Sequence, residues 1–256
     1  MDLLALPAFA DNYIWMLHDG AHAVVVDPGE AQPVVDALDR LRLQLAAILV
    51  THHHPDHVGG VDALRPRLQG VVYGPAREDI PKPFTPLREG DVVGVLGLRF
   101  QVIDVPGHTA GHIAYAQLDE PRAPLLFCGD TLFSAGCGRL FEGTPAQMLA
   151  SLHKLAALPA DTRVCCTHEY TLSNLKFAAA VEPANAQVRT HTQHCESLRA
   201  AGQPTLPSTL ALELQINPFL RSREPAVVAA AQAQGAASAA PVDVLAAVRE
   251  WKNRFR

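Results

Sequence analysis

The chain has 256 residues, of which 48% are hydrophobic and 18% are charged, and its formal net charge is −5. This apolar content supports a folded core and excludes a disordered or fibrous protein. The negative net charge argues against nucleic acid or an anionic membrane as a partner, because both select basic surfaces.

The N-terminal twenty residues contain three aspartates and no lysine or arginine, so they lack the basic start of a secretory or transit peptide. No segment approaches the roughly 20 uninterrupted apolar residues that span a bilayer. Five cysteines are an odd number, and Cys165 and Cys166 are adjacent, which favours reduced thiols over a disulfide framework. We therefore expect a cytoplasmic protein that binds no membrane.

Up to about residue 168, short apolar runs typical of β-strands alternate with turns and helix-like stretches, which is an α/β pattern. Strands are predicted over 23–26, 45–50, 100–105, 125–128 and 164–166. Helical spacing predicts helices over 33–43 and 144–158, the second with Thr144 as N-cap and Pro145 at the first helical position. Beyond residue 168 the β-rich runs stop, and helices are predicted over 173–181, 185–200, 224–239 and 241–255. We expect a metal-binding domain over 1–168 and a helical domain over 169–256.

A cluster of metal-binding side chains follows the predicted strand 45–50, where residues 51–57 read Thr-His-His-His-Pro-Asp-His. In an extended segment, residues two apart project to the same side, so His52 and His54 can bind one ion. Asp56 and His57 follow Pro55 and can turn toward a second ion. Because Pro55 excludes a continuous helix through the motif, we expect these four ligands to lie on a loop.

Three further predicted strands are also followed by histidine or aspartate. The run 100–105 precedes His108 and His112, the run 125–128 precedes Asp130, and the run 164–166 precedes His168. This is the pattern expected if one edge of an α/β layer gathers ligands from several strand ends.

Residues 51–57 match in full the T-H-x-H-x-D-H motif of the metallo-β-lactamase superfamily, which this chain resembles. The resemblance implies an αββα sandwich with a two-metal site, followed here by the helical domain. By position it assigns His52, His54 and His108 to the first metal ion, Asp56, His57 and His168 to the second, and Asp130 to both as a bridging carboxylate.

These side chains also make chemical sense by themselves. Imidazole and carboxylate suit zinc, which we expect, and also iron or manganese. Two divalent ions about 3.5–4 Å apart share a bridging water and lower its pKa, so that hydroxide is available near neutral pH. Asp56 and Asp130 are then the catalytic carboxylates. Asp27 matches a family carboxylate that supports the metal loop, and His112 is expected to support a ligand by hydrogen bonding. His53 alternates to the other side and is expected to pack or to form hydrogen bonds.

A closer resemblance, to the glyoxalase II (hydroxyacylglutathione hydrolase) family, runs along nearly the whole chain. It is carried by residues 9–13, 129–133, 136–139, 168–177 and 217–221. It implies hydrolysis of S-D-lactoylglutathione and related S-(2-hydroxyacyl)glutathione thioesters to a 2-hydroxy acid and glutathione. That reaction is the second step in the detoxification of methylglyoxal, and we expect a monomer to carry it out.

The glutathione carboxylates require cations and hydrogen-bond donors beside the metals. By motif match, the residues that bind glutathione are Arg139, Tyr170, Arg249 and Lys252. Arg249 and Lys252 are three residues apart, so a helix presents both on one face. Arg139 replaces a lysine of other family members, and Phe141 replaces a tyrosine, so the hydroxyl of that tyrosine is missing here.

Other functions are compatible with parts of this pattern. A persulfide dioxygenase of the same superfamily uses one iron, and other thioesterases and β-lactamases share the fold. Outside enzymes, an inactive fold could serve as an RNA-binding or scaffold protein. The complete set of seven ligands argues against inactivation, and the second metal site with the helical C-terminal part argues against the dioxygenase.

Overall fold

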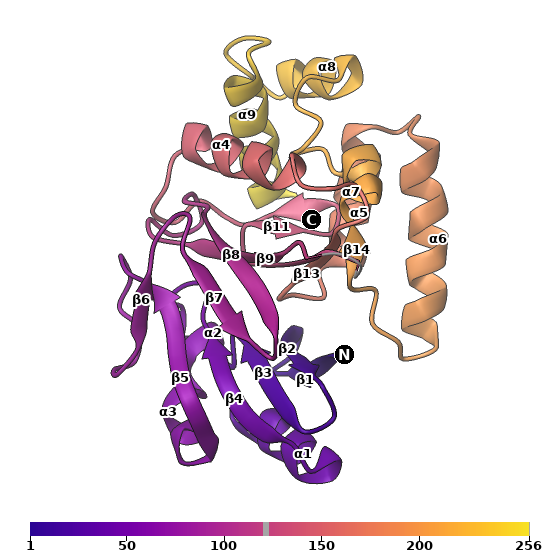
Figure 1. The fold of residues 1–256 in the computed structure, drawn as a ribbon. Helices are drawn as coiled ribbons and strands as arrows, with labels where there is room; N and C mark the ends of the chain where they lie inside the picture. Colours follow the sequence, from indigo (N-terminus) through magenta and orange to yellow (C-terminus); the bar gives the residue numbers. More distant parts are fainter. Residues whose placement is uncertain (120–122, 256) are drawn as a thin grey trace. The chain divides into compact units, whose positions relative to one another are not determined.

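The computed structural model describes residues 1–119 and 123–255 (Figure 1). The chain forms two compact units. Unit 1 comprises Met1–Asp104, Ala110–Gly129 and Cys165–His168, and unit 2 comprises Val105–Thr109, Asp130–Val164 and Glu169–Arg256. The division into units therefore does not follow chain order after Asp104. Two segments that precede residue 168, Val105–Thr109 and Asp130–Val164, belong to the same unit as the helical C-terminal part.

Unit 1 contains a six-stranded sheet in the order β1-β2-β3-β4-β5-β6. Its strands are β1 (Asp2–Ala8), β2 (Asn12–His18), β3 (His22–Val26), β4 (Gln44–Leu49), β5 (Leu68–Pro75) and β6 (Thr85–Leu87). The first three strands are antiparallel, and β3 to β6 are parallel. β3 and β4 are nearly continuous apolar runs, as expected for parallel strands that are covered on both faces.

A second sheet of unit 1 joins β13, β10, β9, β8 and β7 in that order. Its strands are β7 (Val92–Val95), β8 (Leu98–Asp104), β9 (Ile113–Gln117), β10 (Leu125–Gly129) and the last two residues of β13 (Arg163–Cys166). β7 to β10 are antiparallel neighbours. The two predicted strands over 100–105 and 125–128 are thus confirmed as neighbours of β9 in this sheet.

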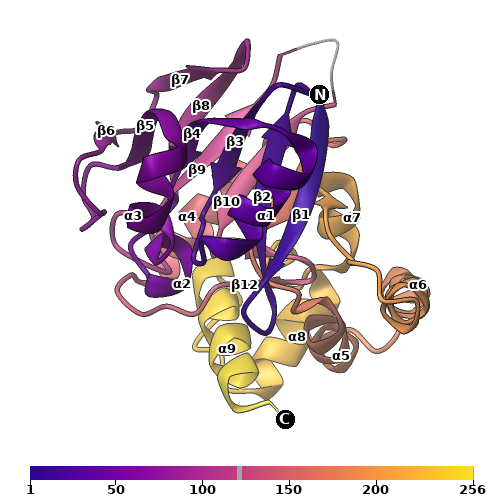
Figure 2. The same ribbon diagram turned by 90° about the horizontal axis from the view of Figure 1, so that it is seen from below.

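Helices α1 (Gln32–Leu41) and α3 (Val61–Leu64) cover one face of the first sheet (Figures 1 and 2). Val34 and Leu38 of α1 and Leu64 of α3 join one hydrophobic cluster with Val25 and Ile48 of the strands. Helix α2 (Pro55–Val58) and a 3-10 turn (Arg65–Arg67) complete the unit. Unit 1 thus has a helix-covered sheet and a second sheet, as the sequence pattern predicts.

Unit 2 contains the helices α4 (Pro145–Ala156), α5 (Thr171–Val181), α6 (Ala186–Ala200), α7 (Leu210–Ile216), α8 (Pro225–Ala233) and α9 (Pro241–Arg254). α9 packs against α4 and α8, and α5 packs against α6 and α8 (Figure 1). A short hairpin, β11 (Leu132–Phe133) and β12 (Gly136–Cys137), belongs to the same unit. The N-cap prediction for Thr144 is confirmed, because its side chain accepts a hydrogen bond from Gln147 N in a full capping box.

Two sequence expectations about the helical part need correction. β-structure does not stop at residue 168, because β14 (Ser208–Thr209) pairs with Arg163 and Val164 of β13. The helix predicted over 224–239 ends at Ala233, since Gln234 and Gly235 leave the helical conformation and Gly235 has φ +91°. Within residues 1–119 and 123–255, no helix has the length and apolar content needed to cross a membrane.

Leu38→Ala tests the core between α1 and the first sheet. The side chain is 2% exposed, so we expect the free energy of unfolding to fall by about 2–5 kcal/mol in urea denaturation. Arg40→Ala, at an exposed position on the same helix, is expected to stay within about 0.5 kcal/mol of the wild-type value. Equal losses in the two variants would contradict this packing.

Candidate active site

A buried carboxylate holds the start of the histidine motif in unit 1. Asp27 follows β3, and Thr51 lies just beyond the end of the neighbouring parallel strand β4. Asp27 accepts hydrogen bonds from Thr51 N and Thr51 Oγ1, both at 2.7 Å. Asp27 Oδ2 also lies 3.0 Å from His57 Nδ1. Because the carboxyl ends of parallel neighbours meet at one sheet edge, this contact places the motif there.

His52 and His54 face each other as ligands of one ion would. His52 Nε2 lies 3.0 Å from His54 Nδ1, and His52 Nδ1 lies 3.1 Å from Thr51 Oγ1. The buried ring of His112 stacks on His52, with centroids 4.5 Å apart and planes at 20°. Gly129 leaves room for the side chains of Thr51 and His112, because a Cβ at this position would lie 2.3 Å from Thr51 Oγ1 and 2.8 Å from His112 Nε2.

A second group in unit 1 joins Asp56, His57 and His168, whose ligand atoms all lie within 4.8 Å of one another. His168 Nδ1 lies 2.9 Å from Asp11 Oδ1, and His168 Nε2 lies 3.4 Å from Asp56 Oδ2. Since a carboxylate only accepts hydrogen bonds, Nδ1 carries the proton and Nε2 keeps its lone pair for a metal. Asn12 Nδ2 donates to Asp56 Oδ2 at 3.1 Å, which orients that carboxylate.

The loop expected across the whole motif is wrong for its second half. Helix α2 begins at Pro55, so Asp56 and His57 lie on its single turn, while His52 and His54 precede it. Proline interrupts a helix when it lies in the helix interior, but it is well suited to the first helical position. The proline therefore starts a helix here.

Unit 2 brings together the two remaining predicted ligands. His108 Nε2 lies 3.4 Å from Asp130 Oδ2, and both side chains are buried. His108 Nδ1 lies 2.9 Å from the Arg139 carbonyl oxygen. A carbonyl only accepts, so Nδ1 again carries the proton and Nε2 keeps its lone pair. Gly138 approaches closely, since a Cβ there would lie 1.9 Å from Asp130 O.

These donor sets fit a divalent metal. They consist of imidazole nitrogens and carboxylate oxygens, which are the ligands of zinc, iron and manganese. In four of the histidines the Nδ1 atom already faces an oxygen, as in metal sites where a partner fixes the ring. Each unit therefore presents side chains prepared to bind a metal.

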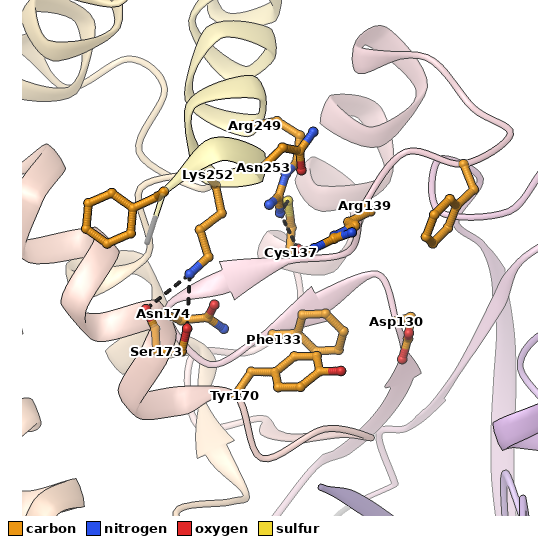
Figure 3. Close-up of a pocket in the computed structure, with 12 residues that line it drawn as sticks. Asp130, Phe133, Cys137, Arg139, Tyr170, Ser173, Asn174, Arg249, Lys252 and Asn253 are labelled. Carbon is orange, nitrogen blue, oxygen red and sulfur yellow. Dashed lines mark hydrogen bonds between the residues drawn. The ribbon is translucent and has the colours of Figure 1, made fainter. Parts of the chain in front are cut away.

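The four residues predicted to bind glutathione lie together in unit 2. Arg139, Tyr170, Arg249 and Lys252 line one pocket of about 570 Å³, and Asp130 lies in its wall (Figure 3). Phe133, Phe141 and Phe255 add aromatic surface, and the rings of Phe133 and Tyr170 meet edge to face with centroids 5.5 Å apart. The pocket thus combines cations and apolar walls with one predicted metal ligand.

The cations differ in their surroundings. Arg249 is 6% exposed and donates from Nη1 to the Cys137 carbonyl at 2.7 Å. Lys252 Nζ donates to Ser173 O at 3.1 Å (Figure 3). Burial, together with the positive charges of Arg249, Arg139 and Lys176, lowers the pKa of Lys252 to about 8. Burial raises the pKa of the Cys137 thiol, so this cysteine stays protonated.

Sequence reasoning missed several residues that touch the predicted ligands. Asp11 and Asn12 fall in the stretch 9–13, which resembles the family, but the resemblance assigned neither residue a role. Glu78 gave no sequence signal, because it lies in the connection between β5 and β6. Its Oε2 accepts from His53 N at 2.6 Å and lies 2.8 Å from His53 Nδ1, and its Oε1 accepts from Gly111 N at 2.9 Å. Glu78 therefore links the two histidine-bearing loops of unit 1.

Comparison with known proteins identifies the same families that the sequence motifs resemble. Residues 9–168 match the family model described as "Metallo-beta-lactamase superfamily", and residues 169–255 match "Hydroxyacylglutathione hydrolase C-terminus". A protein of Albidiferax ferrireducens named hydroxyacylglutathione hydrolase is 64% identical over 255 residues, which is 100% of both chains.

Two solved structures share the fold. ETHE1 from Myxococcus xanthus is 26% identical with a TM-score of 0.67, and the match covers 100% of both chains. TTHA1623 in a di-iron-bound form is 30% identical with a TM-score of 0.59, covering 86% of this chain and 100% of that one. The predicted metallo-β-lactamase fold with a helical C-terminal region is thereby confirmed.

Asp11→Ala tests the orientation of His168. Without the acceptor at Nδ1 the ring loses its fixed tautomer, so we expect the affinity for one zinc ion to fall by roughly 10- to 100-fold. The ion bound through His52 and His54 is expected to stay, so zinc titration against a chelator should resolve one weakened step. Asp62→Ala, which removes a carboxylate that is 71% exposed and bound to Arg65, is the control. Unchanged affinity for both ions in Asp11→Ala would refute the assignment.

Proposed function

Because the chain belongs to the hydroxyacylglutathione hydrolase family of the metallo-β-lactamase superfamily, we propose that it hydrolyses S-D-lactoylglutathione and related S-(2-hydroxyacyl)glutathione thioesters. The products are a 2-hydroxy acid, such as D-lactate, and glutathione. As a member of this family the chain is a thioester hydrolase. The observation that carries the substrate assignment is the pocket of unit 2, where Arg139 and two cations of helix α9, Arg249 and Lys252, line one cavity with Asp130.

The metal assignment follows the predicted ligands. His52, His54 and His108 would hold one ion, Asp56, His57 and His168 would hold the other, and Asp130 would contact both. When bound, two such ions polarise the thioester carbonyl and lower the pKa of water. Zinc is the expected metal, and the di-iron form of TTHA1623 supports iron as a second candidate for this donor set.

The protein's own residues bind and orient the reactants. Arg139, Arg249 and Lys252 attract the glutathione carboxylates, and the Tyr170 hydroxyl supplies a further hydrogen-bond donor. Phe133 and Phe141 give the pocket apolar walls. Asp56, held by Asn12, orients the attacking water by accepting its hydrogen bond.

We propose that the enzyme acts as a cytoplasmic monomer in the second step of methylglyoxal detoxification. Residues 1–168 would serve as the metal-binding domain and residues 169–256 as the glutathione-binding domain. Phe141, which is 62% exposed in the pocket wall, offers no hydroxyl to the substrate.

Steady-state hydrolysis of a panel of thioesters tests the proposed function. The zinc-loaded protein should hydrolyse S-D-lactoylglutathione with a far higher kcat/KM than the lactoyl thioester of a thiol without carboxylates. Removal of the metal by a chelator should abolish turnover, and added zinc should restore it. Oxygen uptake with glutathione persulfide, without thioester hydrolysis, would instead identify a dioxygenase.

The lowered pKa of Lys252 predicts a pH dependence of substrate binding. The ammonium group is charged below about pH 8 and loses its charge above it, so KM should rise as pH passes from 7 to 9. One partly exposed ion pair contributes about 1 kcal/mol, which corresponds to roughly a fivefold change. Lys252→Met should raise KM at pH 7 and remove this dependence, while Lys154→Met, at an exposed position on α4, should retain it. Identical KM profiles of Lys252→Met and wild type would contradict the role of Lys252.

A further inference from the structure

The short hairpin of unit 2 forms one wall of the pocket. Phe133 at the end of β11 and Cys137 at the end of β12 both line the cavity, and Arg139 follows two residues later (Figure 3). The Cys137 carbonyl accepts the hydrogen bond from Arg249. The conformation of this hairpin therefore sets the positions of an aromatic wall and of two of the three cations.

Three side chains from outside the hairpin hold its turn. Asn217 Nδ2 donates to Phe133 O at 3.1 Å and to Gly136 O at 2.9 Å. Asn174 Nδ2, from helix α5, donates to Ser134 O at 3.0 Å. The Ala135 N–H donates to Glu213 Oε2, from helix α7, at 2.8 Å. Four backbone polar groups of consecutive turn residues are thus bound by side chains.

The turn needs this support because its backbone is strained. Ala135 has φ +53°, in the left-handed region that a residue with a Cβ disfavours. Such a conformation is unfavourable and persists only where the surroundings hold it. The turn is also tightly enclosed, since a Cβ at Gly136 would lie 2.5 Å from Asn174 Nδ2. The hairpin shape is therefore imposed by its partners.

Glu213 is a buried acid that the proposed chemistry does not use. Its side chain is fully buried, and burial raises the pKa of its carboxyl group. Asn217 Nδ2 donates to Glu213 Oε2 at 3.1 Å, so the amide and the carboxyl form one hydrogen-bonded unit. Burying a carboxyl group is costly unless it is hydrogen-bonded. Asn174 and Asn217 also fall in two of the family-like stretches, 168–177 and 217–221, and the site chemistry gives neither asparagine a role.

We propose that Glu213, Asn217 and Asn174 are positioning residues for substrate binding, which preset the β11–β12 hairpin as the wall of the pocket. Through the hairpin, Glu213 acts on Phe133 and Arg139 and, by way of the Cys137 carbonyl, on Arg249. A preset wall spares the enzyme the ordering of these groups when the substrate binds. The identity of the ligand rests on the proposed function, whereas the control of the hairpin by Glu213 does not.

Glu213→Leu and Glu213→Gln test this proposal. Leucine removes the acceptor for Ala135 N, whereas glutamine keeps one carbonyl oxygen in the same place. We expect Glu213→Leu to raise KM and the Kd for the inert thioether S-methylglutathione by roughly tenfold, with a smaller change in kcat. Glu213→Gln should restore the wild-type Kd. Hydrogen exchange of the peptide backbone over 132–137 should accelerate in the leucine variant alone.

Glu182→Leu is the matched control. Glu182 is a 5% exposed carboxyl group of the same unit, bound to Arg221 at 2.8 Å and 3.0 Å, and it holds no hairpin atom. This variant should lower Tm while leaving the Kd and the exchange over 132–137 unchanged. A wild-type Kd in Glu213→Leu, or an equal rise of Kd in Glu182→Leu, would overturn the proposal.

Asn217→Asp provides an independent variant should Glu213→Leu fail to fold. The substitution replaces the Nδ2 amide group, which donates to Phe133 O and Gly136 O, by a carboxylate oxygen, which only accepts. It should raise both the Kd for S-methylglutathione and the rate of backbone hydrogen exchange over 132–137. Wild-type exchange over 132–137 in Asn217→Asp overturns the proposal. If the wild-type protein fails to bind S-methylglutathione, the proposed function is wrong, and the exchange measurements alone decide on the hairpin.

Discussion

A histidine ring binds a metal in a defined direction only when its second nitrogen has a partner that fixes the ring. Four of the predicted histidine ligands meet that condition, with local and remote partners alike. His168 is held by Asp11, His57 lies against Asp27, and His108 faces the Arg139 carbonyl. The nitrogens of these predicted ligands are thereby oriented by contacts within the fold.

The fold meets this requirement by placing chemical groups at strand ends. Asp27 and Thr51 come together because β3 and β4 are parallel neighbours whose carboxyl ends share one edge. In unit 2, several groups lie close together along the chain. The segment from Asp130 to Arg139 contains a predicted metal ligand, the hairpin wall and a pocket cation. Under the proposed function, one short stretch would thus serve both metal binding and substrate binding.

The sequence predicted the features whose partners are close along the chain. The histidine motif, the strand ends and the capping box at Thr144 are local patterns, and the strands β3, β4, β8, β10 and β13 lie where the apolar runs predict them. The paired strands β1 and β2 were not identified as strands, because strand pairing is decided by neighbours rather than by propensity alone. The short helix at Pro55 was missed because proline was interpreted as a break rather than as a first helical residue.

Contacts between distant residues were beyond sequence reasoning. Asp11 meets His168 across 157 positions of the chain, and Ala135 meets Glu213 across 78. Neither acid has a spacing or composition that marks it, and Glu78 resembles any acidic loop residue until the structure brings it to His53 and Gly111. A resemblance to a family identified the stretches that contain Asp11 and Asn217, but only the contacts give these residues a role.

The central claim is that a two-metal centre and a glutathione pocket serve one reaction. A crystal structure of the zinc-loaded protein with S-methylglutathione tests it most directly. The account predicts two anomalous zinc peaks bound by the seven assigned side chains, with glutathione carboxylates on Arg139, Arg249 or Lys252. Zinc bound elsewhere, or a thioether outside the pocket formed around Phe133 and Tyr170, would contradict it.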